Sequence, residues 1–354
     1  MRRVVVIGGA GFFGGTLVGE LAAAGVPALT AGRRPSADLR LDAEEPGSLR
    51  AALRRGDVVV DAAGPFQRRS PALVEVAMTQ GFDVVDLSDS LDHAVALNEL
   101  APAIAAAGIR VLSGCSAVSA VVAALVRSSG VAVPRRVSAF LAPASRETAH
   151  RATISAFFAS VAVPIRTRRH GRLTTLRGWS VSRVFPGVGR AFLVEGALSV
   201  TLPRVWPSLE TADLWVTTHV RGADRLLGLI ARAPALRHLL RIATRLGPTV
   251  GRMLGSRRGT FGAEIESPDG SLTVRLLTAT RGSHFVALAP ALLTTRALAT
   301  DSFVGSGLVP ADAQVDPQVL FDELARHGVE LRSERGAGSA GPHSFDDADR
   351  PDAE

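Results

Sequence analysis

VVVIGGAGFFGGT, residues 4–16, sets the architecture expected of this chain. Four β-branched residues, Val4 to Ile7, predict a buried strand, and a helix is expected from Thr16 to Ala24, after a glycine-rich turn. The glycines of this turn fit the spacing G-x-G-x-x-G, which is filled by Gly9, Gly11 and Gly14. Between a strand and a helix, the spacing is typical of a dinucleotide-binding turn, because glycines let the pyrophosphate approach the backbone.

The turn is predicted to hold the pyrophosphate through its backbone. Free N–H groups and the dipole at a helix N-terminus favour an anion there. The residues expected to contact the cofactor in this turn are Gly8, Gly9, Gly11, Phe12, Phe13 and Gly14. The alternative is a glycine-rich turn that joins a strand to a helix and binds nothing.

The second apolar run, Val26 to Ala31, is followed by two arginines. An NAD-preferring site would carry an Asp or Glu here for the ribose 2′-hydroxyl, whereas the guanidinium groups of Arg33 and Arg34 suit a 2′-phosphate. We therefore expect NADP in preference to NAD, although arginine is abundant throughout the chain. Asp42 is expected to contact the adenine or the ribose, or else to cap a nearby helix.

The composition indicates a globular protein and excludes several kinds of chemistry. With 354 residues, 47% of them hydrophobic, the chain can form two domains. It has no lysine and no tyrosine, which excludes a Schiff-base lysine and a Tyr/Lys proton relay. The single cysteine, Cys115, excludes an internal disulfide and a multi-cysteine metal site, and we expect no metal.

The charge and hydropathy patterns limit the kinds of binding partner and the cellular location that we expect. The net charge of +7 comes from 40 basic and 33 acidic side chains with few aromatic residues among them, so we expect no nucleic-acid partner. We expect a cytoplasmic protein, because the chain has no uncharged apolar run of about 20 residues.

Short β-branched runs alternate with helical segments in the first third of the chain. We expect strands at 57–62, 83–87 and 109–112 and helices at 71–80 and 91–107. This alternation predicts an α/β fold with a Rossmann-type, doubly wound parallel sheet, whose ligand site lies at the carboxyl ends of the strands.

A different pattern begins near residue 131. Longer alternating runs at 212–220, 261–266 and 271–280 predict a second, α+β domain with a mixed or antiparallel sheet, and two late helices are expected at 285–299 and 319–325. The predicted units are an NADP-binding domain (1–130), a substrate or dimerisation domain (131–300), a segment that returns to the first domain (301–332) and a disordered tail (333–354).

Several polar residues follow the predicted strands. Asp86, Asp89 and His93 gather two carboxylates and an imidazole near the expected nicotinamide, and a desolvated Asp could supply a proton during reduction. Capping of the helix that begins at Leu91 is the alternative. The loop that follows the 57–62 strand is expected to contact the cofactor through Ala63, Gly64, Pro65 and Phe66.

Substrate contacts are predicted in two places. Cys115 and Ser116 lie in a turn after the 109–112 strand, although a buried, inert thiol is the common alternative for the cysteine. Arg146 and His150 are candidates in the second domain, because arginine suits a carboxylate.

Separated pieces of this sequence resemble the saccharopine dehydrogenase-like oxidoreductases. They are the opening VVVIGGAGFFGG, the AGRR at 31–34, DVVVDAAGPFQ at 57–67, FDVVDLSD at 82–89 and GLVPADAQVDPQVLFDELARHGVEL at 307–331. The resemblance implies an NADP-binding Rossmann domain, an inserted domain that covers the nicotinamide, and hydride transfer to a C=N, C=O or activated C=C bond. Residues 146–258 match only loosely, so the substrate, small or lipid-like, is not defined. Saccharopine itself is not expected, because the lysine-biosynthetic members use a Lys and this chain has none.

Residues 226–254 combine Leu and Ile with arginines in an amphipathic pattern interrupted by Pro234 and Pro248. We expect two helices packed on the second domain with arginine outward, with peripheral membrane contact as the alternative. A homodimer is also left open. The alternative function is a non-enzymatic NADP-binding sensor or a membrane-surface scaffold.

Overall fold

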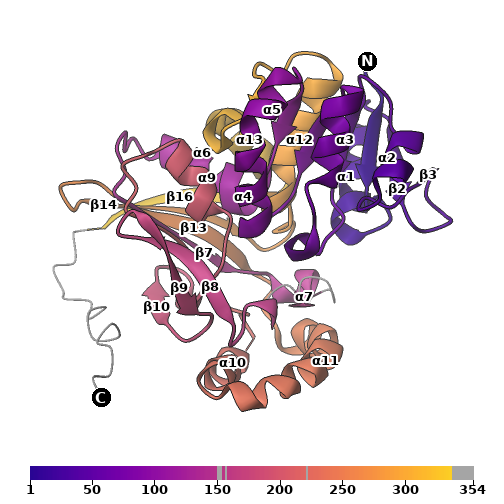
Figure 1. The fold of residues 1–354 in the computed structure, drawn as a ribbon. Coiled ribbons are helices and arrows are strands. Elements are labelled where there is room, and N and C mark those ends of the chain that lie inside the picture. The colour runs from indigo at the N-terminus through magenta and orange to yellow at the C-terminus, as the bar shows by residue number, and fades with distance from the viewer. Residues whose placement is uncertain (150–153, 156–157, 221, 337–354) are drawn as a thin grey trace, which may run out of the picture.

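The structure, a computed structural model, describes residues 1–149, 154–155, 158–220 and 222–336. In this part of the chain, a seven-stranded parallel sheet and a nine-stranded mixed sheet lie one beyond the other, as Figure 1 shows. This confirms the predicted fold class.

The strands of the parallel sheet are β1 (Val4–Ile7), β2 (Ala28–Gly32), β3 (Leu39–Arg40), β4 (Val58–Asp61), β5 (Asp83–Asp86), β6 (Arg110–Leu112) and β15 (Gly307–Leu308). Their order is β15-β6-β5-β4-β1-β2-β3. The order reverses at β1, which pairs with β2 on one side and with β4 on the other. This reversal is the topological switch point where doubly wound sheets bind ligands.

Helices cover both faces of this sheet. They are α1 (Phe12–Ala23), α2 (Pro46–Ala52), α3 (Ala72–Gln80), α4 (Leu91–Glu99), α5 (Ala101–Ala106) and α12 (Phe285–Ala299). Two more helices, α6 (Val122–Ser128) and α13 (Pro317–Arg326), lie between this sheet's helices and the mixed sheet, where they contact the strands at 259–266 and 329–336. Successive residues of β1 face opposite cores: Val4 packs in the core with α1 and α12, and Val5 in the core with α2 and α3. A strand buried on both faces has the continuous apolar sequence that predicted β1.

Two helix predictions need correction. The first helix begins at Phe12 and not at Thr16, so the glycine motif extends into its first turn. The helix expected over 91–107 is two helices, α4 and α5, which meet at Leu100. Pro102 is the reason, because proline has no N–H for a continuous helix but fits the first turn of a new one.

The strands of the mixed sheet are β7 (Arg136–Ala142), β8 (Pro164–Arg169), β9 (Arg172–Arg177), β10 (Ser182–Phe185), β11 (Gly189–Val194), β12 (Thr211–Val216), β13 (Gly259–Glu266), β14 (Leu272–Ala279) and β16 (Val329–Gly336). β7 and β12 pair in parallel, and β7 pairs antiparallel with β13. A core that contains Phe140, Phe185 and Trp215 packs on this sheet. The mixed sheet agrees with the predicted second domain.

Helices also border the mixed sheet. They are α7 (Ser145–Thr148), α9 (Leu198–Thr201), α10 (Ala223–Arg232) and α11 (Leu239–Leu254). Single-turn elements are η1 (Phe66–Arg68), η2 (Ala117–Val121, a π-helix), η3 (Leu202–Arg204), η4 (Pro234–His238) and η5 (Ala311–Ala313). The two helices expected within 226–254 are present as α10 and α11.

The last third of the chain returns to both sheets. α12 packs against α1 and the parallel sheet, and Arg2 N donates to the Ala299 carbonyl at 2.9 Å, so the expected boundary at residue 300 does not follow the packing. β15 extends the parallel sheet, as expected for a returning segment. β16 then pairs with β14 up to Gly336, which corrects the expected start of the tail at 333. The rest of that tail, 337–354, lies outside the described residues.

Candidate functional site

The glycine-rich turn lies at the switch point of the parallel sheet. Gly8 N donates to the Ala31 carbonyl at 2.8 Å, and a Cβ on Gly8, whose φ is +80°, would lie 2.9 Å from Ala63 N. A Cβ on Gly14 would overlap the carbonyl oxygen of Gly8. The turn is thus enclosed between the ends of β2 and β4, and glycine is required where the backbone segments touch.

α1 begins directly after this turn, with Gly11 as its N-cap. The first intrahelical hydrogen bond runs from Gly15 N to the Gly11 carbonyl at 2.8 Å. First-turn amides such as those of Phe13 and Gly14 have no acceptor within a helix, and among the described residues no side chain caps this end. The cradle fits the pyrophosphate of a dinucleotide, because amide donors and the helix dipole both favour an anion.

The two arginines after β2 lie beside the turn. Arg33 and Arg34 are exposed, and Arg34 Nη1 lies 3.5 Å from the Ala10 carbonyl oxygen. Arg33 Nη1 lies 3.9 Å from Asp42 Oδ2. Asp42 closes its own turn by accepting from Glu44 N at 3.1 Å. The helix-capping alternative for Asp42 is wrong, because Glu45 caps α2.

The predicted cofactor loop follows β4 on the other side of the turn. Ala63 N donates to Asp61 Oδ1 at 3.0 Å, Gly64 and Pro65 are exposed, and Phe66 begins η1. Since the backbone of Ala63 borders Gly8, this loop and the glycine turn form one continuous rim at the carboxyl edge of the sheet.

Sequence reasoning missed an ion pair under this rim. Asp61 ends β4, is buried and pairs with Arg69, whose Nη1 also lies 2.7 Å from Glu44 Oε1. A carboxylate that ends an apolar strand such as DVVVD is a signal for a buried charge that needs a partner. The pair connects the end of β4 to the segment before α2.

Asp86 and His93 are brought together at the end of β5, as predicted. Asp86 Oδ1 accepts from Ser88 N at 2.9 Å and from Gly114 N at 2.8 Å, and Asp86 Oδ2 lies 3.4 Å from His93 Nε2. Burial opposes a charged imidazole, but the Asp86 carboxylate outweighs it and raises the pKa of His93. Burial likewise opposes a charged Asp86, and the imidazole with the two amides lowers the pKa of that carboxyl.

One buried polar atom of this pair, His93 Nδ1, has no hydrogen-bond partner among the described residues. Buried polar atoms are nearly always hydrogen-bonded, so unsatisfied ones at a sheet edge mark a place where a ligand or water can complete them. The expected capping of the next helix is also present, since Ser90 Oγ accepts from His93 N.

Asp89 is separate from the Asp86–His93 pair. It is half-buried, and its Oδ1 accepts from Gln67 Nε2 at 3.2 Å, directly after the cofactor loop. Burial raises the pKa of Asp89. The three predicted carboxylate and imidazole groups thus have different properties: Asp86 favours its ionised form, whereas Asp89 holds its proton to a higher pH.

The structure corrects two of the four predicted substrate residues, Cys115 and Arg146. The Cys115 thiol is fully buried, lies 3.4 Å from Thr294 Oγ1, and has a pKa raised to about 12 by burial, so it is inert. Ser116 is half-buried and precedes η2, which keeps it a candidate. Arg146 Nε donates to the Gly255 carbonyl at 2.8 Å, so its side chain caps the end of α11. His150 lies outside the described residues.

A second missed residue is His284, the N-cap of α12. Its ring centroid lies 5.1 Å from that of Phe12, so the segment that leaves the mixed sheet meets the first turn of α1. Phe12 is partly exposed at this contact, and Phe13 packs against the core.

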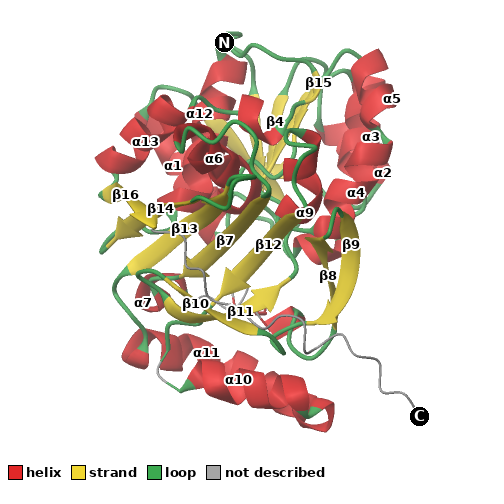
Figure 2. Ribbon diagram, turned by 90° about the vertical axis from the view of Figure 1, so that its left-hand side faces the viewer, coloured by secondary structure: helices red, strands yellow, loops and turns green. Residues whose placement is uncertain are grey.

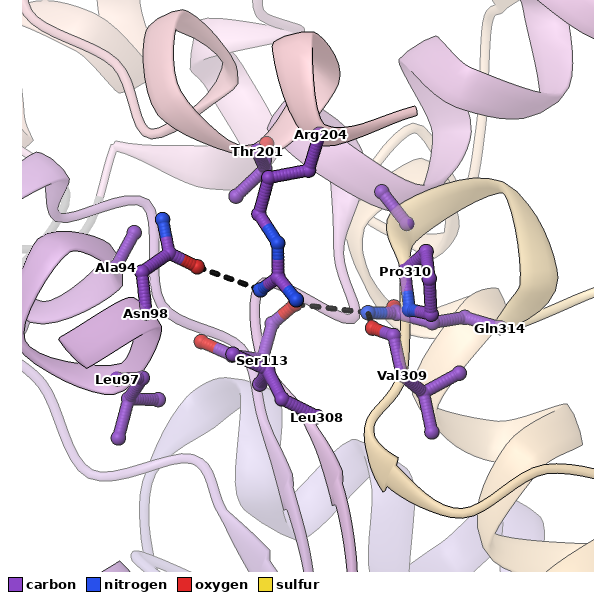
Figure 3. A pocket seen from close by; sticks show the side chains of 11 residues that line it. Ala94, Leu97, Asn98, Ser113, Thr201, Arg204, Leu308, Val309, Pro310 and Gln314 are labelled. Atoms are coloured by element: carbon purple, nitrogen blue, oxygen red, sulfur yellow. Dashed lines mark hydrogen bonds between the residues drawn. The ribbon is translucent and has the colours of Figure 1, made fainter. Parts of the chain in front are cut away.

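A small pocket lies elsewhere, beyond the end of β6 (Figure 3). Its volume is about 20 Å³, and it lies where Arg204 donates to Asn98 Oδ1 at 2.5 Å and Gln314 donates to the Ser113 carbonyl at 2.9 Å. This volume holds a water molecule and not a nicotinamide, so the pocket is not the dinucleotide site.

Comparison with known proteins places the chain only loosely. No protein-family description and no curated protein sequence matches it. Among solved structures, GenD2 from gentamicin A biosynthesis in complex with NAD aligns at 14% identity and a TM-score of 0.38 over 95% of this chain and 97% of that one. UDP-N-acetylglucosamine 3-dehydrogenase GnnA from Acidithiobacillus ferrooxidans aligns at 14% identity and a TM-score of 0.40 over 92% and 96%.

Another solved structure, of an epimerase, matches only part of this chain. UDP-N-acetylglucosamine 4-epimerase from Bacillus cereus aligns at 20% identity and a TM-score of 0.22 over 26% of this chain and 42% of the epimerase, less than half of that enzyme's length. Similarity at these levels carries no argument about activity.

Proposed function

We propose that this protein is an NADP-dependent oxidoreductase of saccharopine dehydrogenase-like type, which transfers a hydride to a C=N, C=O or activated C=C bond of a small or lipid-like substrate. The observation that carries the proposal is the glycine turn enclosed at the switch point of the parallel sheet, with the proton-holding groups of β5 along the same edge. A bound dihydronicotinamide supplies the hydride.

The residues at the carboxyl edge of the parallel sheet have different roles in this proposal. The turn and α1 bind the pyrophosphate, and Arg33 and Arg34 bind a 2′-phosphate, which a free guanidinium can hold through two hydrogen bonds. Asp89 supplies the proton to the reduced atom, because burial raises the pKa of its carboxyl and its Oδ1 lies beside the cofactor loop. Asp86 and His93 position the loop between them.

Calorimetric titration with NADPH and NADH tests the cofactor assignment. We expect NADPH to bind more tightly than NADH, and Gly11→Asp to remove binding of both, because its carboxylate would face the pyrophosphate. Arg33→Ala/Arg34→Ala should weaken NADPH and leave NADH unchanged. Arg40→Ala, an exposed arginine on β3, is the matched control and should change neither. Equal affinities in the double variant and the wild type would refute the 2′-phosphate assignment.

Turnover separates the oxidoreductase from the sensor or scaffold alternative. NADPH consumption is followed with panels of imines, ketones and α,β-unsaturated carbonyl compounds, and the Asp89→Asn variant is measured beside the wild type. We expect Asp89→Asn to reduce the rate by about 10²-fold or more while NADPH affinity stays the same. A protein that binds NADPH and consumes it with no acceptor would be a sensor or scaffold.

A further inference from the structure

The positive charge of this protein is concentrated in one segment. Residues 222–258 contain eight arginines and one acid, Asp224, and therefore carry a charge equal to the net +7 of the whole chain. The remaining residues carry equal numbers of basic and acidic side chains. A charge confined to a tenth of the chain indicates an electrostatic surface for a partner of opposite sign.

This segment forms α10 and α11, which lie at the end of the mixed sheet away from the parallel sheet in both ribbon views (Figures 1 and 2). An isolated bridge between Val220 and Gly255 brings the start of α10 next to the end of α11. The carboxylate of Asp224, the one acid of the segment, already accepts a hydrogen bond from Thr218 N at 2.7 Å.

One side of each helix packs against the rest of the protein, and a glycine lies at each contact. A Cβ on Gly251 of α11 would lie 2.5 Å from Ala149 Cβ, so α11 contacts α7 through glycine. A Cβ on Gly228 of α10 would lie 3.1 Å from the ring of Phe192 in β11. Leu227 and Ile230 of α10 and Leu240 of α11 are buried as well, whereas other large apolar residues of the two helices remain exposed.

Four of these exposed apolar side chains have more than half of their surface exposed. Met253 is 69%, Leu254 62%, Leu229 55% and Leu226 52% exposed. Exposed arginines flank them in each helix, namely Arg225 and Arg232 in α10 and Arg245 and Arg252 in α11. We call the exposed residues at positions 225, 226, 229, 232, 245, 252, 253 and 254 the α10–α11 patch.

We propose that the α10–α11 patch docks this protein on a lipid surface that carries anionic headgroups. Arginine neutralises the headgroups, and leucine and methionine side chains enter the boundary with the acyl chains, the combination by which interfacial amphipathic helices bind. The docking is peripheral: among the described helices, none is long and apolar enough to cross a membrane. The inference goes beyond the oxidoreductase proposal and does not depend on it.

Co-sedimentation with vesicles, performed without dinucleotide, tests the proposal. We expect binding to vesicles of phosphatidylglycerol and phosphatidylcholine, little binding to phosphatidylcholine alone, and a decrease as salt rises from 0.05 to about 0.5 M, because salt screens the charges. Arg225→Glu/Arg252→Glu should weaken binding by at least about tenfold. The matched control Arg40→Glu/Arg172→Glu reverses two exposed arginines outside the patch and should leave binding unchanged.

The apolar contribution has its own pair of variants. Leu229→Asp/Met253→Asp should abolish binding, and Val184→Asp/Val304→Asp, at two exposed valines elsewhere, should not. Unchanged circular dichroism and melting temperature show that each variant is folded. Equal binding to both vesicle types, or equal loss in patch and control variants, would overturn the proposal. The proposal would also be overturned if the protein bound no vesicles and formed a dimer that Leu229→Asp/Met253→Asp dissociates, because a second copy of the chain would then cover the patch.

Discussion

Asp86 is the residue on which the geometry of the candidate site depends most. One of its carboxylate oxygens joins the ends of two strands by accepting from Ser88 N and Gly114 N, and the other faces His93. A single side chain therefore sets both the position of the β5 and β6 loops and the charge of the imidazole. Loss of the charge and loss of the hydrogen bonds should have separable effects.

The Asp86→Asn variant isolates the charge. Asn can still accept from the two amides. Without the carboxylate, burial is the largest influence left on the imidazole, Arg69 acts in the same direction and Asp61 opposes them more weakly, so the pKa of His93 should fall below the ordinary value of about 6.5. Imidazole NMR titration of the wild type and the variant measures this. Asp42→Asn, away from His93, is the control, and a pKa of His93 that stays raised in Asp86→Asn would contradict the assignment.

The same pair gives the fold a pH dependence. The pKa of His93 is raised in the folded chain, so its interaction with Asp86 stabilises the fold fully below the unfolded pKa and is lost as pH rises through the raised value. We expect the difference in the free energy of unfolding between wild type and Asp86→Asn to shrink on passing from mildly acidic to mildly alkaline pH. Urea unfolding at both pH values measures it, and a difference that grows with pH would exclude this linkage.

Two glycines of α1 offer a test of the close approach in the cofactor turn. Gly14→Ala places a methyl group on the Gly8 carbonyl oxygen, whereas Gly19→Ala, in the same helix, meets nothing within 4 Å. Gly19→Ala should stabilise the protein by about 0.5 to 1 kcal/mol, because alanine favours the helix. Gly14→Ala should lower both the free energy of unfolding and the affinity for NADPH. A Gly14→Ala variant more stable than the wild type would show that the backbone segments of the turn are not in close contact.

Individual residues show where sequence reasoning reached its limit. The spacing of the glycines and the pairing of Asp86 with His93 could be predicted, since both depend on residues close in the sequence. The sequence indicates a buried Cys115 only as the alternative to a substrate contact, because Thr294 of α12, which contacts it, lies 179 positions away. The role of Arg146 could not be predicted, because its acceptors lie at the end of α11.

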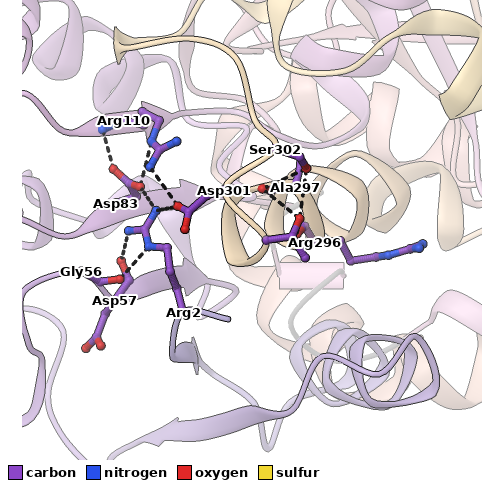
Figure 4. A network of polar contacts seen from close by, with 10 residues as sticks. Arg2, Gly56, Asp57, Asp83, Arg110, Arg296, Ala297, Asp301 and Ser302 are labelled. Atoms are coloured by element: carbon purple, nitrogen blue, oxygen red, sulfur yellow. Dashed lines mark hydrogen bonds and ion pairs between the residues drawn. The ribbon is translucent and has the colours of Figure 1, made fainter.

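At the scale of elements, the amino edge of the parallel sheet is held by an ionic network opposite the candidate site (Figure 4). Asp83, at the start of β5, accepts from Arg2 Nη1 at 2.6 Å and from Arg110 Nε at 2.9 Å. Arg2 also donates to the Gly56 carbonyl at 2.7 Å. The network joins the segments before β1 and β4 to the first residues of β5 and β6, so it stabilises the sheet at the edge opposite the candidate site.

Asp83→Asn should therefore destabilise the fold without affecting the cofactor. Asp83 is buried, and removing its charge leaves Arg2 and Arg110 with only the exposed Asp301 as an anion nearby, which should lower the free energy of unfolding by about 3 kcal/mol. Asp301→Asn is the control: Asp301 is 68% exposed and lies 3.7 Å from Arg2 Nη1, so its loss should change stability by less than about 0.5 kcal/mol. Urea unfolding and NADPH titration are measured on both; a change in NADPH affinity would contradict the separation.

Element boundaries were predictable where the pattern was local. The strands β4, β5, β13 and β14 fall within or close to the apolar runs that predicted them, and α12 has the predicted bounds. The assignment of α12 to the second domain did not follow its packing, because its sequence is apolar nearly all round and does not indicate which sheet it covers. The place of β16 could not be predicted either, because its partner residues in β14 lie 50 to 64 positions earlier in the chain.

At the scale of the whole molecule, the two sheets are joined by more than the chain crossing between them. Arg166 of β8 lies between Asp92 of α4, at 2.5 Å, and Glu195, at 3.5 Å. Ala197 N donates to the Asp89 carbonyl at 3.1 Å. The second domain therefore rests directly on the helix and loop that carry the candidate proton donors, so its position and theirs are coupled.

Truncation tests how far the C-terminal segment closes this assembly. A chain that ends at Gly336 keeps β16, and the acidic, glycine- and serine-rich composition of 337–354 predicts an unchanged melting temperature. A chain that ends at Gly328 loses all eight residues of β16, exposes the edge of β14, and should melt at least about 5 °C lower and aggregate more readily. Thermal unfolding and light scattering compare the two. Equal melting temperatures would mean that β14 is stable without a neighbouring strand and that the fold does not need β16. The expected difference would mean that β16 stabilises the molecule by connecting the helices of the C-terminal segment to the mixed sheet.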